Sequence, residues 1–256
     1  MLLANSDLIL SQLSDDSVVL DIGGWALPFN RANYVMDAEP YQTRGHYNRT
    51  FARSNPFPPL GGTVERFTSS TWIQRDICEK TPYPFHDKSI DFVICSHTLE
   101  DVRDPLWVCS EMIRIAKAGY IEIPSRRWET CRGLETGITG LSHHRWLIET
   151  EDDGLRFLQK FHKINTWRYS LPAAELRRMS EQEKVTWLFW RESFGFREVT
   201  LHGDAQTDEL QRFVNSVQPY PAGLLALYQQ WDLVSHLSRR AIGKGRRTLA
   251  SLSAKG

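Results

Sequence analysis

The chain has 256 residues, with 31 basic and 31 acidic side chains that leave no formal net charge. This length favours one domain with embellishments, and 41% hydrophobic with 24% charged residues is typical of a globular protein rather than a disordered one. The balance of charges gives no overall field that would attract nucleic acid, so we expect no nucleic-acid partner.

Three further features predict a cytoplasmic location. The N-terminal residues lack the basic region of a signal peptide, and no apolar run has the length of a membrane span. None of the four cysteines forms a CxxC pair, and no histidine spacing is typical of a zinc site, which is the usage expected in a reducing compartment. These cysteines are Cys78, Cys95, Cys109 and Cys131.

The first half of the chain alternates short apolar strands with connections. A helix is expected to begin at Pro105 and to end at Gly119. Such alternation predicts a parallel, doubly wound sheet. The predicted strands cover 17–22, 34–37, 72–78, 89–95 and 120–123.

The second half predicts helices over 151–161 and 173–184, followed by a hairpin of strands 185–191 and 196–202. The complete fold prediction is an α/β, Rossmann-like, doubly wound and mostly parallel sheet with a reversed terminal strand. It also has an inserted loop over about 39–71, after the second strand, and a helical C-terminal extension. We place the main domain at 1–204 and the extension at 205–256.

Three groups of residues lie at the ends of the first three predicted strands. Asp21-Ile22-Gly23-Gly24 closes the first strand, where a glycine pair lets the backbone approach a nucleotide. Asp37 ends the second strand, where a carboxylate can accept both ribose hydroxyls of an adenosine-containing cofactor. Asp76-Ile77 follows as a carboxylate for an adenine amino group beside an apolar side chain for its ring. Each group alone is common, but their order on successive strands predicts a nucleotide site.

The segment from Thr81 to Pro124 resembles the core of the class I S-adenosylmethionine-dependent methyltransferase family, the ubiquinone- and menaquinone-type branch especially. The resemblance rests on a Pro-Phe pair before the fourth strand, on Asp91 in that strand, and on the motif His97-x-Leu99-Glu100 with a following Asp104-Pro105. It implies S-adenosylmethionine as cofactor, with Ser96 and His97 beside it, and no metal or covalent intermediate for methyl transfer.

Three departures separate the chain from the family pattern. Trp25 stands near the position of the usual third glycine, Asp101 replaces a frequent second histidine, and only Ala118-Gly119 remains of a Pro-Gly-Gly turn. Two alternatives therefore stay open, namely a non-catalytic cofactor-binding module of the same fold and a nucleotide-dependent oxidoreductase. The missing full GxGxxG motif and the Asp76-Ile77 pair count against the oxidoreductase.

For the acceptor we expect a hydroxyl on a small molecule or glycan. His143 and His144 are the predicted catalytic residues, and His143 is favoured as the base that takes the hydroxyl proton. The alternative is that this pair forms hydrogen bonds within a loop. Glu122, Glu129 and Glu135 could join His143 around a divalent metal, but no ligand spacing supports this, and no metal is predicted.

The C-terminal segment 231–256 is basic, with interspersed apolar residues, and carries six cationic side chains. One interpretation is contact with an anionic surface; the other, which we favour, is a solvated terminal helix. The cationic residues are Arg239, Arg240, Lys244, Arg246, Arg247 and Lys255.

Overall fold

The computed structural model describes residues 1–51, 56–152 and 154–217 together with 227, 230 and 234, so the basic segment 231–256 lies almost entirely outside the described residues. The chain forms two compact units. The first consists of Met1–Ser125, His144–Gln159 and Glu181–Val199, and the second of the segments between and after them.

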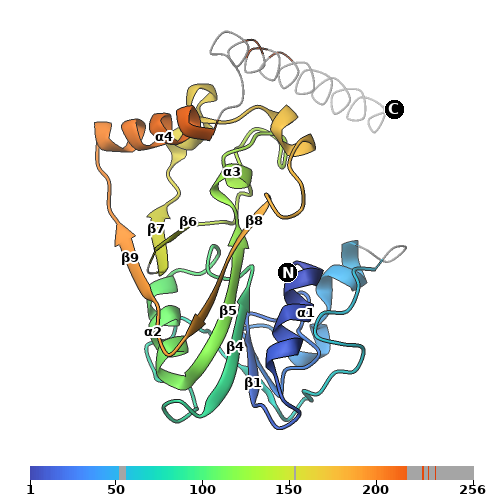
Figure 1. The fold of residues 1–256 in the computed structure, drawn as a ribbon. Coiled ribbons are helices and arrows are strands. Elements are labelled where there is room, and N and C mark those ends of the chain that lie inside the picture. Colours follow the sequence, from blue (N-terminus) through green and yellow to red (C-terminus); the bar gives the residue numbers. More distant parts are fainter. Residues whose placement is uncertain (52–55, 153, 218–226, 228–229, 231–233, 235–256) are drawn as a thin grey trace, which may run out of the picture. The chain divides into compact units, whose positions relative to one another are not determined.

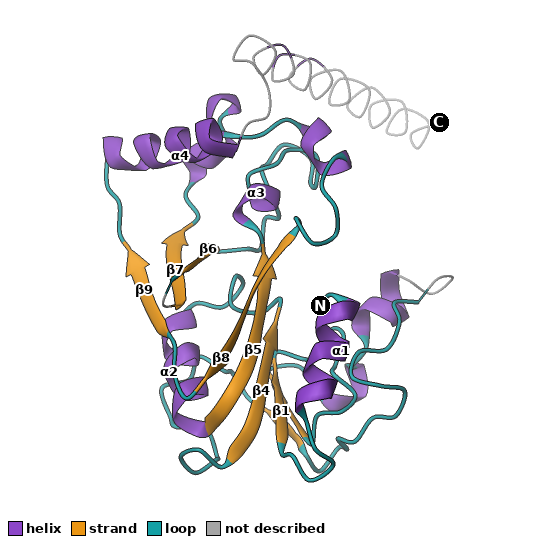
Figure 2. Ribbon diagram, viewed as in Figure 1, coloured by secondary structure: helices purple, strands orange, loops and turns teal. Residues whose placement is uncertain are grey.

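The first unit is built on a six-stranded sheet in the order β3-β2-β1-β4-β5-β8 (Figures 1 and 2). Neighbouring strands are parallel except β8, which runs antiparallel to β5, as the predicted reversed strand requires. The α/β, mostly parallel fold is confirmed. The strands are β1 (Val19–Ile22), β2 (Tyr34–Asp37), β3 (Trp72–Gln74), β4 (Ile90–Ser96), β5 (Ala116–Pro124) and β8 (Val185–Arg191).

A helix covers each face of this sheet (Figure 1). Side chains of successive strand residues point to opposite faces. Thus Val19 of β1 packs in the cluster that contains Ile9 of helix α1 (Leu3–Gln12), whereas Leu20 packs in the cluster of helix α2 (Pro105–Ile115). Because both faces are covered, the strands are apolar almost without interruption, which is why they could be found in the sequence.

Helix α2 begins at Pro105, and the side chain of Asp104 caps it by accepting a hydrogen bond from the Trp107 N–H at 2.9 Å. It ends at Ile115, directly before β5, so the prediction that Gly119 ends it is wrong. Gly119 lies inside β5, where a Cβ atom would come within 2.7 Å of Val93. The glycine serves close packing within the sheet rather than helix termination.

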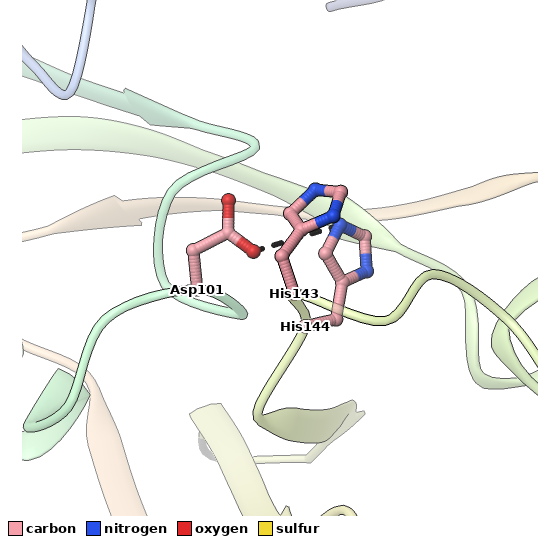
Figure 3. A group of neighbouring side chains, drawn as sticks. All are labelled: Asp101, His143 and His144. Atoms are coloured by element: carbon pink, nitrogen blue, oxygen red, sulfur yellow. Dashed lines mark ion pairs between the residues drawn. The ribbon is translucent and has the colours of Figure 1, made fainter.

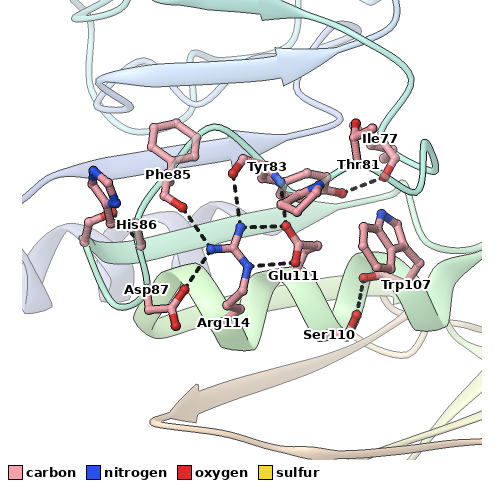
Figure 4. A network of polar contacts seen from close by, with 12 residues as sticks. Ile77, Thr81, Tyr83, Phe85, His86, Asp87, Trp107, Ser110, Glu111 and Arg114 are labelled. Carbon is pink, nitrogen blue, oxygen red and sulfur yellow. Dashed lines mark hydrogen bonds and ion pairs between the residues drawn. The ribbon is translucent and has the colours of Figure 1, made fainter.

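A polar network fixes α2 to the loop before β4 (Figure 4). Arg114 donates to the carbonyls of Tyr83 and Phe85 at 3.1 and 2.9 Å and pairs with Glu111 at 2.7 Å. Glu111 also accepts a hydrogen bond from the Tyr83 N–H at 2.6 Å. Burial disfavours the Glu111 carboxylate, but these donors outweigh it and lower its pKa. The Pro-Phe segment of the family motif is therefore anchored through its backbone.

The first unit also holds a three-stranded sheet, in the order β6-β7-β9. Strands β6 (Trp146–Glu151) and β7 (Gly154–Gln159) are antiparallel, and β9 (Gly195–Val199) runs parallel to β7. The helix predicted over 151–161 is therefore wrong. The predicted hairpin of 185–191 and 196–202 is wrong as well, because β8 joins the large sheet and β9 the small one.

The second unit consists of short helices around a small apolar cluster of Cys131, Leu171, Met179 and Val214. The helix predicted over 173–184 shortens to the 3₁₀ helix η5 (Ala173–Arg177). Beside it lie α3 (Arg126–Glu129), η3 (His162–Asn165), η4 (Trp167–Tyr169) and α4 (Asp204–Val217). In the part of the chain that the structure describes, no helix combines the length and the apolar character needed to cross a membrane.

The segment between β2 and β3 is irregular, as the predicted insertion requires. It contains η1 (Tyr41–Thr43) and the π-helical turn η2 (Tyr47–Phe51), and Leu60 forms an isolated bridge with Phe29. Tyr47 and Leu60 both reach the pocket described below. The insertion therefore contributes to the wall of that pocket.

Candidate functional site

The face of the large sheet that α1 covers changes from apolar to polar toward the carboxyl ends of its strands. Val19, Phe92 and Ala118 are buried apolar residues on this face. Further along the same strands and on the same face, the positions are Asp21, Ser96 and Glu122. Polar groups thus gather at the carboxyl edge, where doubly wound sheets bind ligands.

A pocket of about 460 Å³, counting its open mouth, lies at this edge. It includes five of the predicted cofactor residues, namely Asp21, Gly23, Gly24, Ser96 and His97. Its remaining walls are mostly apolar. They are formed by Met1, Ala26, Leu27, Phe29, Tyr47, Leu60 and Ile94.

Asp21 brings a carboxyl group to the pocket. Its side chain is 3% exposed, and its Oδ2 accepts a hydrogen bond from the Phe29 N–H at 2.9 Å. Burial raises the pKa of Asp21 to about 7, and the neighbouring Asp37 adds to the effect. A carboxyl group with this pKa changes its charge near neutral pH.

The two glycines after β1 are required by the protein itself. Gly23 has φ +76°, in the left-handed region, and a Cβ atom there would lie 2.1 Å from the Thr98 hydroxyl. A Cβ at Gly24 would lie 2.3 Å from the Asp21 carboxylate. Both backbones line the pocket, but a side chain at either position meets protein before it meets a ligand.

Backbone hydrogen bonds fix the Asp37 carboxylate at the end of β2. Its Oδ2 accepts from the Trp25 N–H at 3.1 Å and its Oδ1 from the Glu39 N–H at 2.9 Å. Burial raises its pKa, and these backbone donors oppose that rise. Trp25, at the position of the missing glycine, stacks on His46 with ring centroids 4.6 Å apart. The carboxylate thus has a fixed orientation and keeps lone pairs for further donors.

Asp76 and Ile77 lie after β3 rather than in it, because the strand ends at Gln74. Burial is the largest single influence on Asp76 and raises its pKa, but its ion pair with Arg103 and a hydrogen bond from the Cys78 N–H at 2.8 Å contribute to a net lowering of that pKa. Ile77 is 7% exposed and packs in the cluster of α2. The carboxylate is therefore already paired, and the apolar side chain faces the core.

His97 is the most constrained side chain of the pocket. Its backbone has φ +52°, which is uncommon for a residue other than glycine, and its N–H donates to the Glu122 carbonyl at 2.8 Å. Its Nε2 lies 3.2 Å from Glu122 Oε1, and its Nδ1 lies 3.5 Å from Glu100 Oε1, an ion-pair distance. Burial lowers the pKa of His97, but the two carboxylates outweigh this and raise it to about 9. His97 is therefore a cation at neutral pH.

Behind His97, Glu122 is fully buried and surrounded by donors. The Leu2 N–H donates to it at 3.0 Å, the Met1 amino group lies at 3.1 Å, and the Tyr120 hydroxyl donates to it. Burial disfavours its charge, but the donors hold the pKa of Glu122 well below its usual range. This saturated carboxylate fixes His97 in the pocket.

The two predicted catalytic histidines lie near each other and near Asp101, but they differ in burial. His144 is 7% exposed, belongs to the first unit and lies 3.6 Å from Asp101 through its Nε2 (Figure 3). His143 is exposed and is the last residue of a segment of the second unit. Neither lines the pocket. Tyr47 does line the pocket. Burial raises its pKa most, and the carboxylates of Asp101 and Glu100 raise it further.

Two contributors to the site were not assigned to it from the sequence. Glu122 was considered only as a metal ligand, because the alternation of strand faces does not say which face carries the pocket. Tyr47 belongs to an irregular insertion, where no periodicity predicts the direction of a side chain. Glu100 was visible as a motif residue, but its burial beside His97 was not.

Comparison with known proteins gives one family match. Residues 53–121 match the family model described as "Methyltransferase domain". The match covers β3, β4, α2 and most of β5, and it begins after the altered glycine loop. No curated protein matches the chain.

Solved structures resemble parts of the chain. A Haloferax volcanii methyltransferase in complex with the Trm112 methyltransferase activator has 17% identity and a TM-score of 0.32, over 47% of this chain and 51% of that one. A SAM-dependent methyltransferase of Aquifex aeolicus has 15% identity and a TM-score of 0.31, over 48% and 65%.

A Haemonchus contortus phosphoethanolamine N-methyltransferase, in complex with phosphomonomethylethanolamine and S-adenosylhomocysteine, has 15% identity and a TM-score of 0.30, over 48% and 28%. The chain thus matches between about a quarter and two thirds of the length of these three structures. Over residues 53–121, the resemblance of the sequence motifs to the class I S-adenosylmethionine-dependent methyltransferase family is confirmed.

Proposed function

We propose that this chain transfers a methyl group from S-adenosylmethionine to a hydroxyl on a small molecule or glycan. The observation that carries the proposal is the gathering of Asp37, the Gly23-Gly24 backbone, Ser96 and His97 at the carboxyl edge of β2, β1 and β4. This is the edge where doubly wound sheets bind nucleotides. The family match over residues 53–121 supports methyl transfer as the chemistry.

The residues fit the ribose and methionine parts of the cofactor better than its adenine. Asp37 would hold the ribose hydroxyls, and the pocket walls would hold the methionine part. At the adenine end, Asp76 would have to share its carboxylate with Arg103. S-adenosylmethionine, when bound, supplies a methyl group that is already activated, so the protein has to align the acceptor and remove its proton.

For the proton we propose His144 with Asp101. A carboxylate beside an imidazole orients the ring and stabilises the charge that the ring gains, as in other nucleophile-activating pairs. Asp101 lies 3.6 Å from His144 and influences Tyr47 in the pocket wall. We therefore favour His144 over His143, because His144 is buried beside Asp101 whereas His143 is exposed.

Calorimetry tests the cofactor assignment. Asp37→Ala removes a charged acceptor, and such a hydrogen bond contributes roughly 1.5–3 kcal/mol, so S-adenosylmethionine should bind about ten- to a hundredfold more weakly. The loss should be smaller for a 2′-deoxy analogue, because one hydrogen bond is already absent. Binding of NAD in place of S-adenosylmethionine would support the oxidoreductase, and binding of neither would overturn the proposal.

Once an acceptor is known, turnover tests the base. His144→Ala should bind S-adenosylmethionine normally and lose about 10²–10⁴-fold in turnover, the usual contribution of a general base. The acidic limb of its pH–rate profile should flatten. His143→Ala is the matched control and should retain both turnover and profile; equal, small effects from the two variants would remove the base assignment.

A further inference from the structure

Glu100 is a buried carboxylate without a hydrogen bond. The side chain is 1% exposed, and neither of its oxygens has a hydrogen-bond partner among the described residues. The nearest charged group is the His97 imidazole, at 3.5 Å. Because burying a polar group without hydrogen bonds is costly, such a group needs an explanation. Glu100 interacts electrostatically with Tyr47 as well as with His97, and both of these side chains line the pocket.

Asp21 is a second carboxyl group without a matching cation. It is 3% exposed, has one backbone hydrogen bond and forms no ion pair with any described residue. It lines the pocket directly, as do the apolar residues Phe29 and Ile94. Of the two acidic groups, Asp21 thus lies in the wall of the cavity, and Glu100 lies beside His97, which lines it.

The cations nearby do not offset these carboxyl groups. The Met1 amino group and His97 both lie against a third carboxylate, Glu122, at 3.1 and 3.2 Å. Two cationic groups thus face three acidic ones. In a site with little water, this imbalance favours a ligand that carries positive charge.

We propose that the acidic excess of Asp21 and Glu100 makes the pocket prefer the cationic sulfonium form of the cofactor over the neutral thioether that remains after methyl transfer. The inference rests on the proposed function. It gives a role to the negative charge that the contacts of these two carboxyl groups leave unbalanced. It would also favour release of S-adenosylhomocysteine after the reaction, because transfer of the methyl group removes the positive sulfonium charge that these carboxyl groups attract.

Calorimetry with S-adenosylmethionine and S-adenosylhomocysteine tests this inference without turnover. The measured quantity is the ratio of the two dissociation constants. In the wild type, S-adenosylmethionine should bind more tightly. Glu100→Gln and Asp21→Asn should each reduce the preference by at least about tenfold, because two unit charges about 12 Å apart at an effective dielectric constant near 20 already interact by the corresponding energy of about 1.4 kcal/mol, and closer charges interact more strongly.

Asp91→Asn is the matched control. Asp91 lies on β4 as well, but near the start of the strand, where it pairs with Lys117 at 2.7 Å. Its replacement should leave the ratio unchanged. Thermal melting shows which variants fold, and Glu100→Gln is the safer one because it removes no hydrogen bond. Each folded pocket variant tests the inference by itself.

The outcomes separate the two proposals. If the wild type binds neither compound, both the proposed function and this inference are wrong. If the wild type binds both, but every folded pocket variant keeps the wild-type ratio, the function stands and the inference is wrong. A wild type that prefers the thioether would also contradict it.

Discussion

Two buried acidic networks lie on opposite faces of the large sheet, and they are built differently. On the α2 face, Glu111 has its carboxylate satisfied by Arg114 and by the Tyr83 N–H (Figure 4). On the α1 face, Glu122 is equally well satisfied, but the neighbouring Glu100 has no hydrogen bond. In the first network the acidic group has its hydrogen bonds within the protein, whereas the second network extends to His97 in the pocket wall.

The difference separates a carboxylate that holds the fold from one that is free to act on a ligand. A buried ion pair with all its hydrogen bonds stabilises the folded state only as a unit, because removal of one partner leaves an uncompensated charge. A carboxylate with no hydrogen bond contributes little of this kind and can be neutralised at small cost. Stability measurements can therefore distinguish the two networks without any ligand.

The largest effect is expected for Arg114→Ala. It leaves Glu111 buried without its cation, and breaking such a pair costs about 3–5 kcal/mol. Since Arg114 is partly exposed, we expect the lower end of that range in chemical denaturation. Glu100→Gln should change the free energy of unfolding by less than about 1 kcal/mol, because no hydrogen bond is lost. Equal losses would abolish the distinction between the networks.

The same pair gives a check with pH. The folded-state pKa of Glu111 is lowered, so its stabilising contribution is complete above the unfolded value of about 4.3 and is lost as the pH falls through the folded one. The difference in stability between wild type and Arg114→Ala should therefore shrink in acid. A difference that stays constant down to pH 3 would mean that the pair contributes through packing alone.

The next largest effect concerns the glycine that joins β1 to the pocket. Gly23→Ala combines a left-handed backbone with a Cβ atom 2.1 Å from the Thr98 hydroxyl, and we expect a loss of about 2–3 kcal/mol. Gly45→Ala has a similar φ of +69° but open space around the Cβ, so it should lose only about 1 kcal/mol. Equal losses would mean that Thr98 moves aside without cost.

This comparison also adds a structural reason for Gly23 to our expectation from the sequence, where the glycine pair was to let the backbone approach a nucleotide. The glycine pattern was recognised because a strand that ends in two glycines is visible without a structure. Its physical reason was not, because Thr98 lies 75 residues further along the chain. Long-range neighbours of this kind cannot be derived from local pattern.

The same limit explains which elements were predicted. The parallel strands are short and apolar on both faces, so their positions followed from the sequence, as did the helix that starts at Pro105. The segment 154–159 was taken for part of a helix because short apolar runs fit either period. Asp152 and Gly154, which are typical turn residues, were the available signal for the hairpin of β6 and β7.

In the site, the carboxyl-end residues Asp21, Asp37 and His97 could be found because strand ends are visible in the sequence. The distinction between His143 and His144 could not, since neighbouring residues in a loop differ in burial only once the fold is known. Glu100 carries the same lesson. A motif shows that an acidic residue is present, but only packing shows that its carboxylate lacks a hydrogen bond among the described residues.

The smallest expected effect is a dependence of cofactor binding on pH, which arises from Asp21 on the α1 face. The pKa of Asp21 is about 7, and the charged groups that influence it are Asp37 and the Met1 amino group. Below pH 7 Asp21 is mostly protonated and attracts a cation weakly; above pH 7 it is ionised. A cation that binds beside it therefore favours loss of the proton, and by linkage binds more tightly as the pH rises.

Between pH 6 and pH 8 the affinity for S-adenosylmethionine should therefore rise by up to about tenfold, which is the effect of one proton released over one pH unit. The affinity for S-adenosylhomocysteine should rise less, because it lacks the sulfonium charge. His97 stays protonated over this range because its pKa is about 9, so it does not contribute to the change. In Asp21→Asn the dependence should disappear, and a dependence that survives in that variant would assign the proton to another group.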